Sequence, residues 1–171
     1  MSLFSRLFGK RPDDRAEVRP LWHKIVELSR DPAWYAECRV ADTVPGRFDA
    51  ITLVLSAVLL RMEREPALIP ASARLTELFV DDMDGQLRQS GVGDIVVGKH
   101  MGRLMSALGG RLGAYREALA ANDDTALAEA IDRNVSLADG GEPGLVAARF
   151  KALAERVDAL PADRLLAGDF A

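Results

Sequence analysis

Residues 45–64, PGRFDAITLVLSAVLLRMER, decide the fold. From Ile51 to Leu60 this stretch is apolar nearly all round a helix. A surface helix carries one apolar stripe, whereas a helix that is apolar all round is buried by neighbours on several sides. The run is also far shorter than the roughly 20 residues needed to cross a bilayer. We therefore predict that residues 45–64 form the central, buried helix of a bundle.

The residues that flank this helix are suited to begin and end it. Asp42 or Thr43 is placed to accept a hydrogen bond from the first helical turn, and Pro45 is compatible with that turn. Pro66 cannot continue a helix, so the helix is expected to end before it.

Elsewhere, apolar residues recur in steps of three and four, which is the period of an amphipathic helix. No stretch shows the sustained alternation of a half-buried strand, and no linker is long enough to divide the chain. The sequence therefore predicts an all-α fold, a single-domain bundle of about six to seven helices within residues 15–171. Besides the central helix, the expected helical segments are about 18–29, 34–38, 72–89, 95–119, 127–135 and 146–160.

The longest helical pattern also contains four glycines. A glycine inside a helix costs about 1 kcal/mol relative to alanine, so some other interaction must offset it. We expect a neighbouring helix to approach closely there, because a missing side chain lets two backbones come together. The glycines are Gly102, Gly109, Gly110 and Gly113.

Composition narrows the class of protein. The 171 residues are 49% hydrophobic and 28% charged, a balance typical of a globular domain. A formal net charge of -4 gives no broad positive field, so DNA is not an expected partner. The single cysteine, Cys38, excludes an intramolecular disulfide and is expected to be a small buried residue. Without a signal-peptide pattern, we expect a cytoplasmic protein.

Two motif fragments and the two histidines lack the residues or spacing that ligand binding would require. Residues 93–100, GDIVVGKH, match part of a phosphate-binding loop, but His100 stands where Ser or Thr would bind magnesium. Residues 81–85, DDMDG, lack the alternation of a calcium loop. His23 and His100 lie on different expected helices without metal-ligand spacing. The sequence therefore predicts no metal, no cofactor and no catalytic site.

Residues 1–14 are expected to form a basic, partly apolar N-terminal arm. On a helix, its apolar residues would share one face. An arm this small would make weak peripheral contact with an anionic membrane, and the alternative is a frayed terminus. The apolar residues are Leu3, Phe4, Leu7 and Phe8, and the basic residues are Arg6, Lys10 and Arg11.

Two blocks of the sequence resemble the ubiquinol–cytochrome c chaperone family. The first, YAECRVADTVPGRFD at 35–49, is similar to that family's tyrosine followed by V-x-D-T-x-x-G-R-F-D. The second, FVDDMDGQLRQSGVGDIVVGK at 79–99, is similar to its F-x-D-M-D, L-R and G-V-G-D stretch. The order and spacing also agree, and the resemblance covers about residues 21–119.

The resemblance implies a helical, non-enzymatic chaperone that assists assembly of the ubiquinol–cytochrome c reductase complex. The implied partners are nascent or immature cytochrome b and a second assembly factor, with ribosome contact left open. Such a protein would work at the cytoplasmic face of the inner membrane. The signature positions, expected to bind a partner or to hold the structure, are Tyr35, Asp42, Thr43, Gly46, Arg47, Phe48, Asp49, Asp82, Asp84, Gly91, Gly93, Asp94 and Lys99.

Arg47 lies close in sequence to Asp42 and Asp49, so we expect a hydrogen-bonded ion pair that fixes the turn. If exposed, such a pair is worth only about 0–1 kcal/mol. Phe48 is expected to be buried. Adaptable contacts with an apolar client are expected from Met83, Met101 and Met105, unless these are ordinary core residues.

Two other functions stay open from the sequence. One is a helical haem- or quinone-binding protein with His23 or His100 as a ligand. The other is a membrane-surface adaptor that uses residues 1–11.

Overall fold

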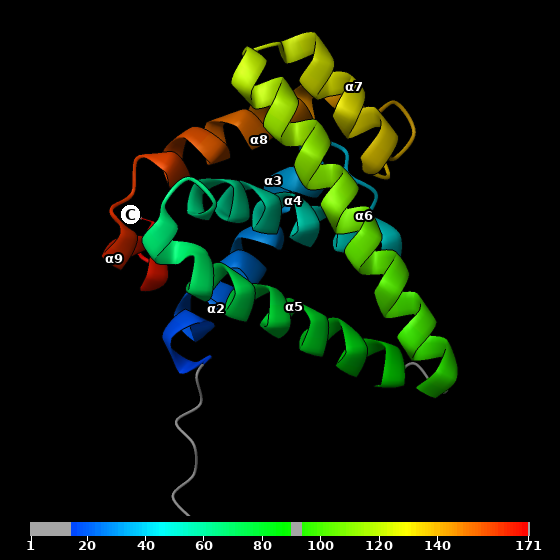
Figure 1. Cartoon of the computed structure of the whole chain (residues 1–171). Coiled ribbons are helices and arrows are strands. Elements are labelled where there is room, and N and C mark those ends of the chain that lie inside the picture. Colours follow the sequence, from blue (N-terminus) through cyan, green and yellow to red (C-terminus); the bar gives the residue numbers. More distant parts are fainter. Residues whose placement is uncertain (1–14, 90–93, 171) are drawn as a thin grey trace, which may run out of the picture.

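The computed structural model describes residues 15–89 and 94–170, and the all-α, single-domain prediction is confirmed. In the described residues, the only extended pairing is one isolated antiparallel bridge between Val40 and Leu137. The elements, labelled in Figure 1, are the short 3-10 helices η1 (Ala16–Val18) and η2 (Pro66–Leu68) and the α-helices α2 (Arg19–Ser29), α3 (Pro32–Ala36), α4 (Val44–Met62), α5 (Ile69–Gln89), α6 (Asp94–Ala121), α7 (Asp124–Asn134), α8 (Pro143–Asp158) and α9 (Ala162–Leu166).

The structure departs from the expected boundaries in a few places. The helix α9 was not predicted; its five residues follow Pro161 and bury Leu165. Residues 94–99 belong to α6 and residues 81–85 belong to α5. Both motif fragments are therefore helical in the parts described, and neither forms a ligand-binding loop.

The helix α4 lies in the middle of the molecule, and α2, α5, α6 and α8 pack around it (Figure 1). Every residue from Asp49 to Leu60 is buried, as its all-round apolar sequence predicts. At its start, the Thr43 side chain accepts a hydrogen bond from the Gly46 N–H at 3.3 Å. Thr43 is therefore the N-cap, one of the two residues expected for that role.

The carboxylate of Asp49 is buried within α4 and joins three segments of the chain. One oxygen accepts a hydrogen bond from Arg111 Nη2 in α6 at 2.6 Å. The other accepts from the N–H and Oγ–H of Ser136, after α7, at 2.9 and 2.8 Å. The Asp49 and Arg111 side chains are only 7% and 12% exposed. A buried charge is tolerated when it is paired and hydrogen-bonded, so this network holds α6 and the α7–α8 connection against α4.

The close helix contact expected at the α6 glycines is wrong. A Cβ added at any of the four glycines would meet no atom within 4 Å outside the local helix backbone. At Gly46, by contrast, it would lie 1.9 Å from the Ala41 carbonyl oxygen. Close backbone approach therefore occurs at the first turn of α4, and nothing in the structure explains the glycines of α6.

Replacing Asp49 with alanine should lower the free energy of unfolding by about 3–5 kcal/mol, because Arg111 would keep a buried charge without its partner. Arg47→Ala is the control: its pair with Asp42 is exposed, with side chains 67% and 61% accessible. That variant should lose no more than about 1 kcal/mol. Urea denaturation followed by circular dichroism measures both, and equal losses would contradict the assignment.

Gly46→Ala should destabilise the fold by about 1–3 kcal/mol or more, because the added methyl collides with backbone. Gly110→Ala makes the same change at an exposed helix position with open space, and should stabilise by up to about 1 kcal/mol. Thermal melting of the two variants compares them. Opposite signs are expected; a stabilised Gly46→Ala protein would refute the steric argument.

Candidate functional site

A recess with a volume of about 960 Å³ lies where α2, α3, the start of α4, the end of α5 and α6 meet. We call it the α4 groove. Helices far apart in sequence supply its apolar surface, so its shape depends on how they pack. The main apolar residues are Tyr35, Val44, Phe48, Ile51, Met83 and Leu104.

Two side chains of α4 expose apolar surface to the groove. Phe48 packs against Phe79, with ring centroids 6.2 Å apart, and the Arg111 guanidinium lies 5.5 Å from the Phe48 centroid. Phe48, expected to be buried, is partly buried: it packs on the core while its remaining surface lines the groove. Val44 is 84% exposed. An exposed apolar side chain beside an apolar recess is typical of a binding surface.

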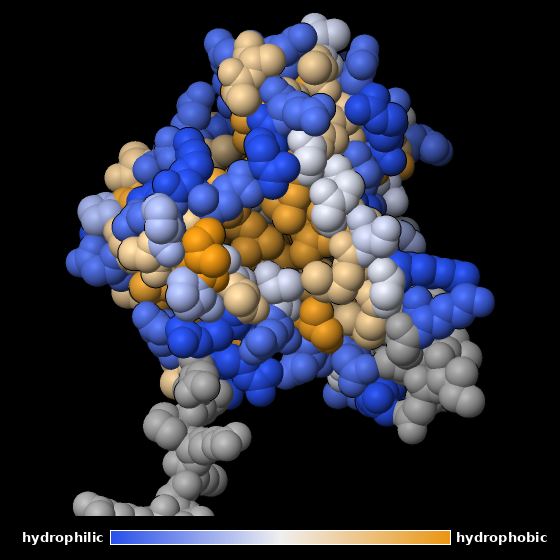
Figure 2. All heavy atoms as spheres, in the orientation of Figure 1, coloured by the Kyte–Doolittle hydropathy of each residue, from blue (hydrophilic) through white to orange (hydrophobic). Residues whose placement is uncertain are grey.

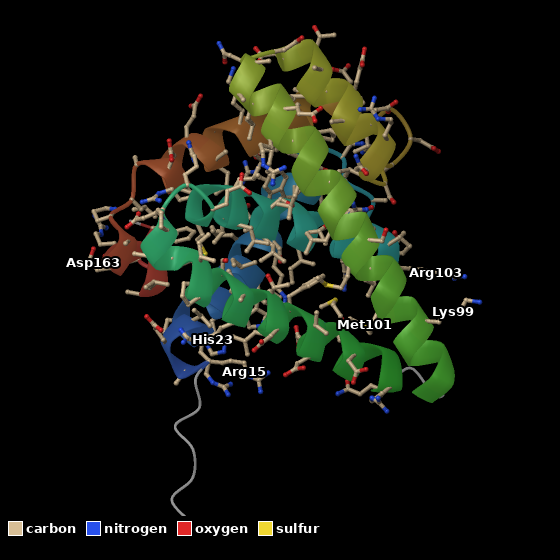
Figure 3. The ribbon with its side chains drawn as sticks, viewed as in Figure 1. Arg15, His23, Lys99, Met101, Arg103 and Asp163 are labelled. Atoms are coloured by element: carbon tan, nitrogen blue, oxygen red, sulfur yellow. The ribbon has the colours of Figure 1, made fainter. Side chains whose placement is uncertain are left out.

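Apolar surface is also visible on the face framed by α5 and α6. Figure 2 shows apolar side chains gathered in a hollow there, with hydrophilic side chains around it. Met101 points from α6 toward the α5 side, while Lys99 and Arg103 point away from the body (Figure 3). Met101 is half-buried, and Met105 is 37% exposed. The signature residue Lys99 is thus exposed and does not line the α4 groove.

The rim of the groove is polar and carries both signs of charge. Arg47 Nε donates to Asp42 Oδ1 at 2.7 Å, which confirms the expected ion pair; Arg47 forms it with Asp42 rather than Asp49. This hydrogen bond holds the pKa of Asp42 below its ordinary value and raises the pKa of Arg47, so both are charged at neutral pH. Tyr35 Oη donates to the Ser29 carbonyl at 2.9 Å, and burial raises the pKa of Tyr35.

The remaining signature positions divide between structure and other surfaces. Asp82 lines the groove and accepts from Gln86 Nε2 at 3.4 Å. Asp84 lies off the groove and accepts from Arg88, one turn along α5, at 2.7 Å. Asp94 is the first residue of α6, but its side chain falls outside the described residues. Gly91 and Gly93 also lie outside them. The signature positions that line the groove are Tyr35, Asp42, Arg47, Phe48 and Asp82.

Sequence reasoning missed two residues that hold the site in place. Arg111 lies three residues after Leu108 and four before Tyr115, inside the apolar stripe of its helix. A charge in such a stripe is a signal that could have found it, because buried charges are paired. Ser136 has no comparable signal in the sequence.

Groups suited to metal or nucleophilic chemistry do not converge in the described part of the chain. No cluster of three or more His, Cys, Asp or Glu side chains could hold a metal there. His23 is exposed on α2, and the His100 side chain is outside the described residues. Burial raises the pKa of the Cys38 thiol, which disfavours the nucleophilic thiolate. Neither His23 nor Cys38 therefore adds support to a haem site or a catalytic site.

None of the described helices combines the length and apolar character that a bilayer crossing requires.

Comparison with known proteins gives the chain a family. The model of the ubiquinol-cytochrome C chaperone family matches residues 36–171. The crystal structure of the Cbp3 homolog from Brucella abortus is similar with a TM-score of 0.80 and 33% sequence identity, over 98% of this chain and 94% of that one. No curated protein matches the sequence. The chain therefore belongs to the ubiquinol–cytochrome c chaperone family, and its role is that of a chaperone in assembly of the respiratory complex.

Proposed function

We propose that this assembly chaperone binds an apolar segment of nascent or immature cytochrome b in the α4 groove. The observation that carries the proposal is the exposed apolar surface at Val44, Phe48 and the neighbouring lining residues, together with a polar rim. A membrane protein that is not yet inserted exposes apolar side chains to water. Covering them in an apolar recess is favourable in proportion to the area removed from water.

The chemistry of the rim favours holding a client over reacting with it. The Asp42 carboxylate is already engaged by Arg47, and the Tyr35 hydroxyl donates to a backbone carbonyl. A general base or nucleophile needs a group poised to exchange a proton near neutral pH, whereas Asp42 has a lowered pKa and Tyr35 a raised one. We therefore expect no enzymatic activity at the groove.

We place the encounter at the cytoplasmic face of the inner membrane, where the client enters the bilayer. The carboxylate of Asp82, on the α5 part of the lining, can pair with a flanking positive charge of the client and help to fix its direction. A second assembly factor would bind elsewhere on the body, and this mode of binding does not require the ribosome.

Val44→Asp should abolish client binding while sparing the fold. Val44 is exposed and begins α4, and a carboxylate at a helix N-terminus is electrostatically favourable. In cells lacking the chromosomal gene, the variant should lower mature cytochrome b, measured by its reduced-minus-oxidised absorbance, to nearly the level without the protein.

The matched control is Leu145→Asp, because Leu145 is 48% exposed and does not line the groove. It should keep cytochrome b at the wild-type level. Immunoblots check that each variant is present in equal amount. Normal cytochrome b in Val44→Asp cells would reject the groove as the client site.

A further inference from the structure

The described body begins at Arg15, next to α5, one of the helices that supply the wall of the α4 groove. Arg15, its first residue, forms an ion pair with Asp81 of α5, and the adjacent Asp82 lines the groove. Figure 3 shows Arg15 close to α5. A second pair, Arg74 Nη1 to Glu17 Oε2 at 3.1 Å, ties η1 to the same helix. Residues 1–14 are therefore attached at a fixed point within about two turns of α5 from the groove.

Residues 1–14 are long enough to cover this recess. Fourteen residues span up to roughly 50 Å when extended and about 21 Å as an α-helix. Either length exceeds the step along α5 from Asp81 to the groove residues Met83 and Gln86, which is under about 8 Å.

The composition of this segment suits the groove. Its apolar residues, Leu3, Phe4, Leu7 and Phe8, have the helical spacing of segments that lay one face in an apolar groove. Its basic residues, Arg6, Lys10 and Arg11, complement the carboxylate of Asp82, which lines the groove and accepts a hydrogen bond only from the neutral Gln86 among the described contacts.

Tethering makes even a weak interaction effective. A short flexible link gives an attached segment an effective concentration in the millimolar range. Four apolar residues on their own bind a membrane surface only marginally. The same residues tethered near a groove meet it at a high effective concentration.

We propose that residues 1–11 fold back and place their apolar face in the α4 groove, so that the chain covers its own binding surface until a client displaces this segment. Competition with the client rests on the function proposed above. Docking of the segment does not, because it follows from the groove and the attachment point.

Intramolecular crosslinking of the full chain tests the docking. In a Cys38→Ala background, Gly9→Cys is combined with Gln86→Cys, on the groove side of Asp81, or with Glu77→Cys, at a similar distance on the other side. Both positions on α5 are exposed. A short bismaleimide should link residues 9 and 86 at monomer mass at least about tenfold faster than residues 9 and 77, and melting curves confirm that each variant is folded.

The docking also predicts which changes abolish this preference. Phe4→Asp with Phe8→Asp, and separately Val44→Asp, should bring the rate at position 86 down to that at position 77, while Leu145→Asp should leave it unchanged. Equal rates in the unaltered pair, products only at dimer mass, or a preference that survives these changes would overturn the proposal. Equal rates together with binding of the segment to anionic vesicles would assign it to the membrane instead.

The crosslink is measured on purified protein without a client, so the two proposals fail separately. A negative crosslink overturns the docking of residues 1–11 and leaves the client role standing. A wild-type level of cytochrome b in Val44→Asp cells overturns the client role and leaves the docking of residues 1–11 standing.

Discussion

The buried pair between Asp49 and Arg111 is the interaction on which the rest of the structure depends. Removing two charges from water is costly, and here the cost is offset by short hydrogen bonds to each other, to Ser136 and to Thr52. The pair fixes α6 across α4. Leu104 lies seven residues before Arg111, two turns along the same helix, so the position of one wall of the groove follows from this pair.

The first turn of α4 combines structure and binding within a few residues. Thr43 caps the helix, Gly46 allows the chain to pass against Ala41, and Asp49 joins the buried network. Between them, Arg47 and Phe48 line the groove. Because side chains along a helix turn by about 100° per residue, adjacent positions face the core and the recess in turn. The signature residues therefore fix the start of α4 and also supply part of the groove surface.

A chaperone for an apolar client must expose apolar surface without aggregating. The α4 groove confines that surface to a recess with a charged rim, which limits contact with other folded proteins. A segment of the same chain that covers the recess would reduce the exposed area further, at little entropic cost because it is already tethered. The groove thus meets a requirement that follows from membership of the ubiquinol–cytochrome c chaperone family: apolar surface must be available to a client without causing aggregation.

The sequence by itself determined the helices apart from α9, the central place of α4 and an ion pair of Arg47 with a nearby aspartate. These follow from apolar periodicity and from charged residues that lie close together in the sequence. The Asp49 network joins residues 62 and 87 positions apart, and the groove gathers side chains from five helices. Only the tertiary structure decided these, because periodicity shows which face of a helix is apolar but not which helix will cover it. The α6 glycines failed as a prediction for the same reason: their spacing does not show whether their side of the helix meets a neighbour or solvent.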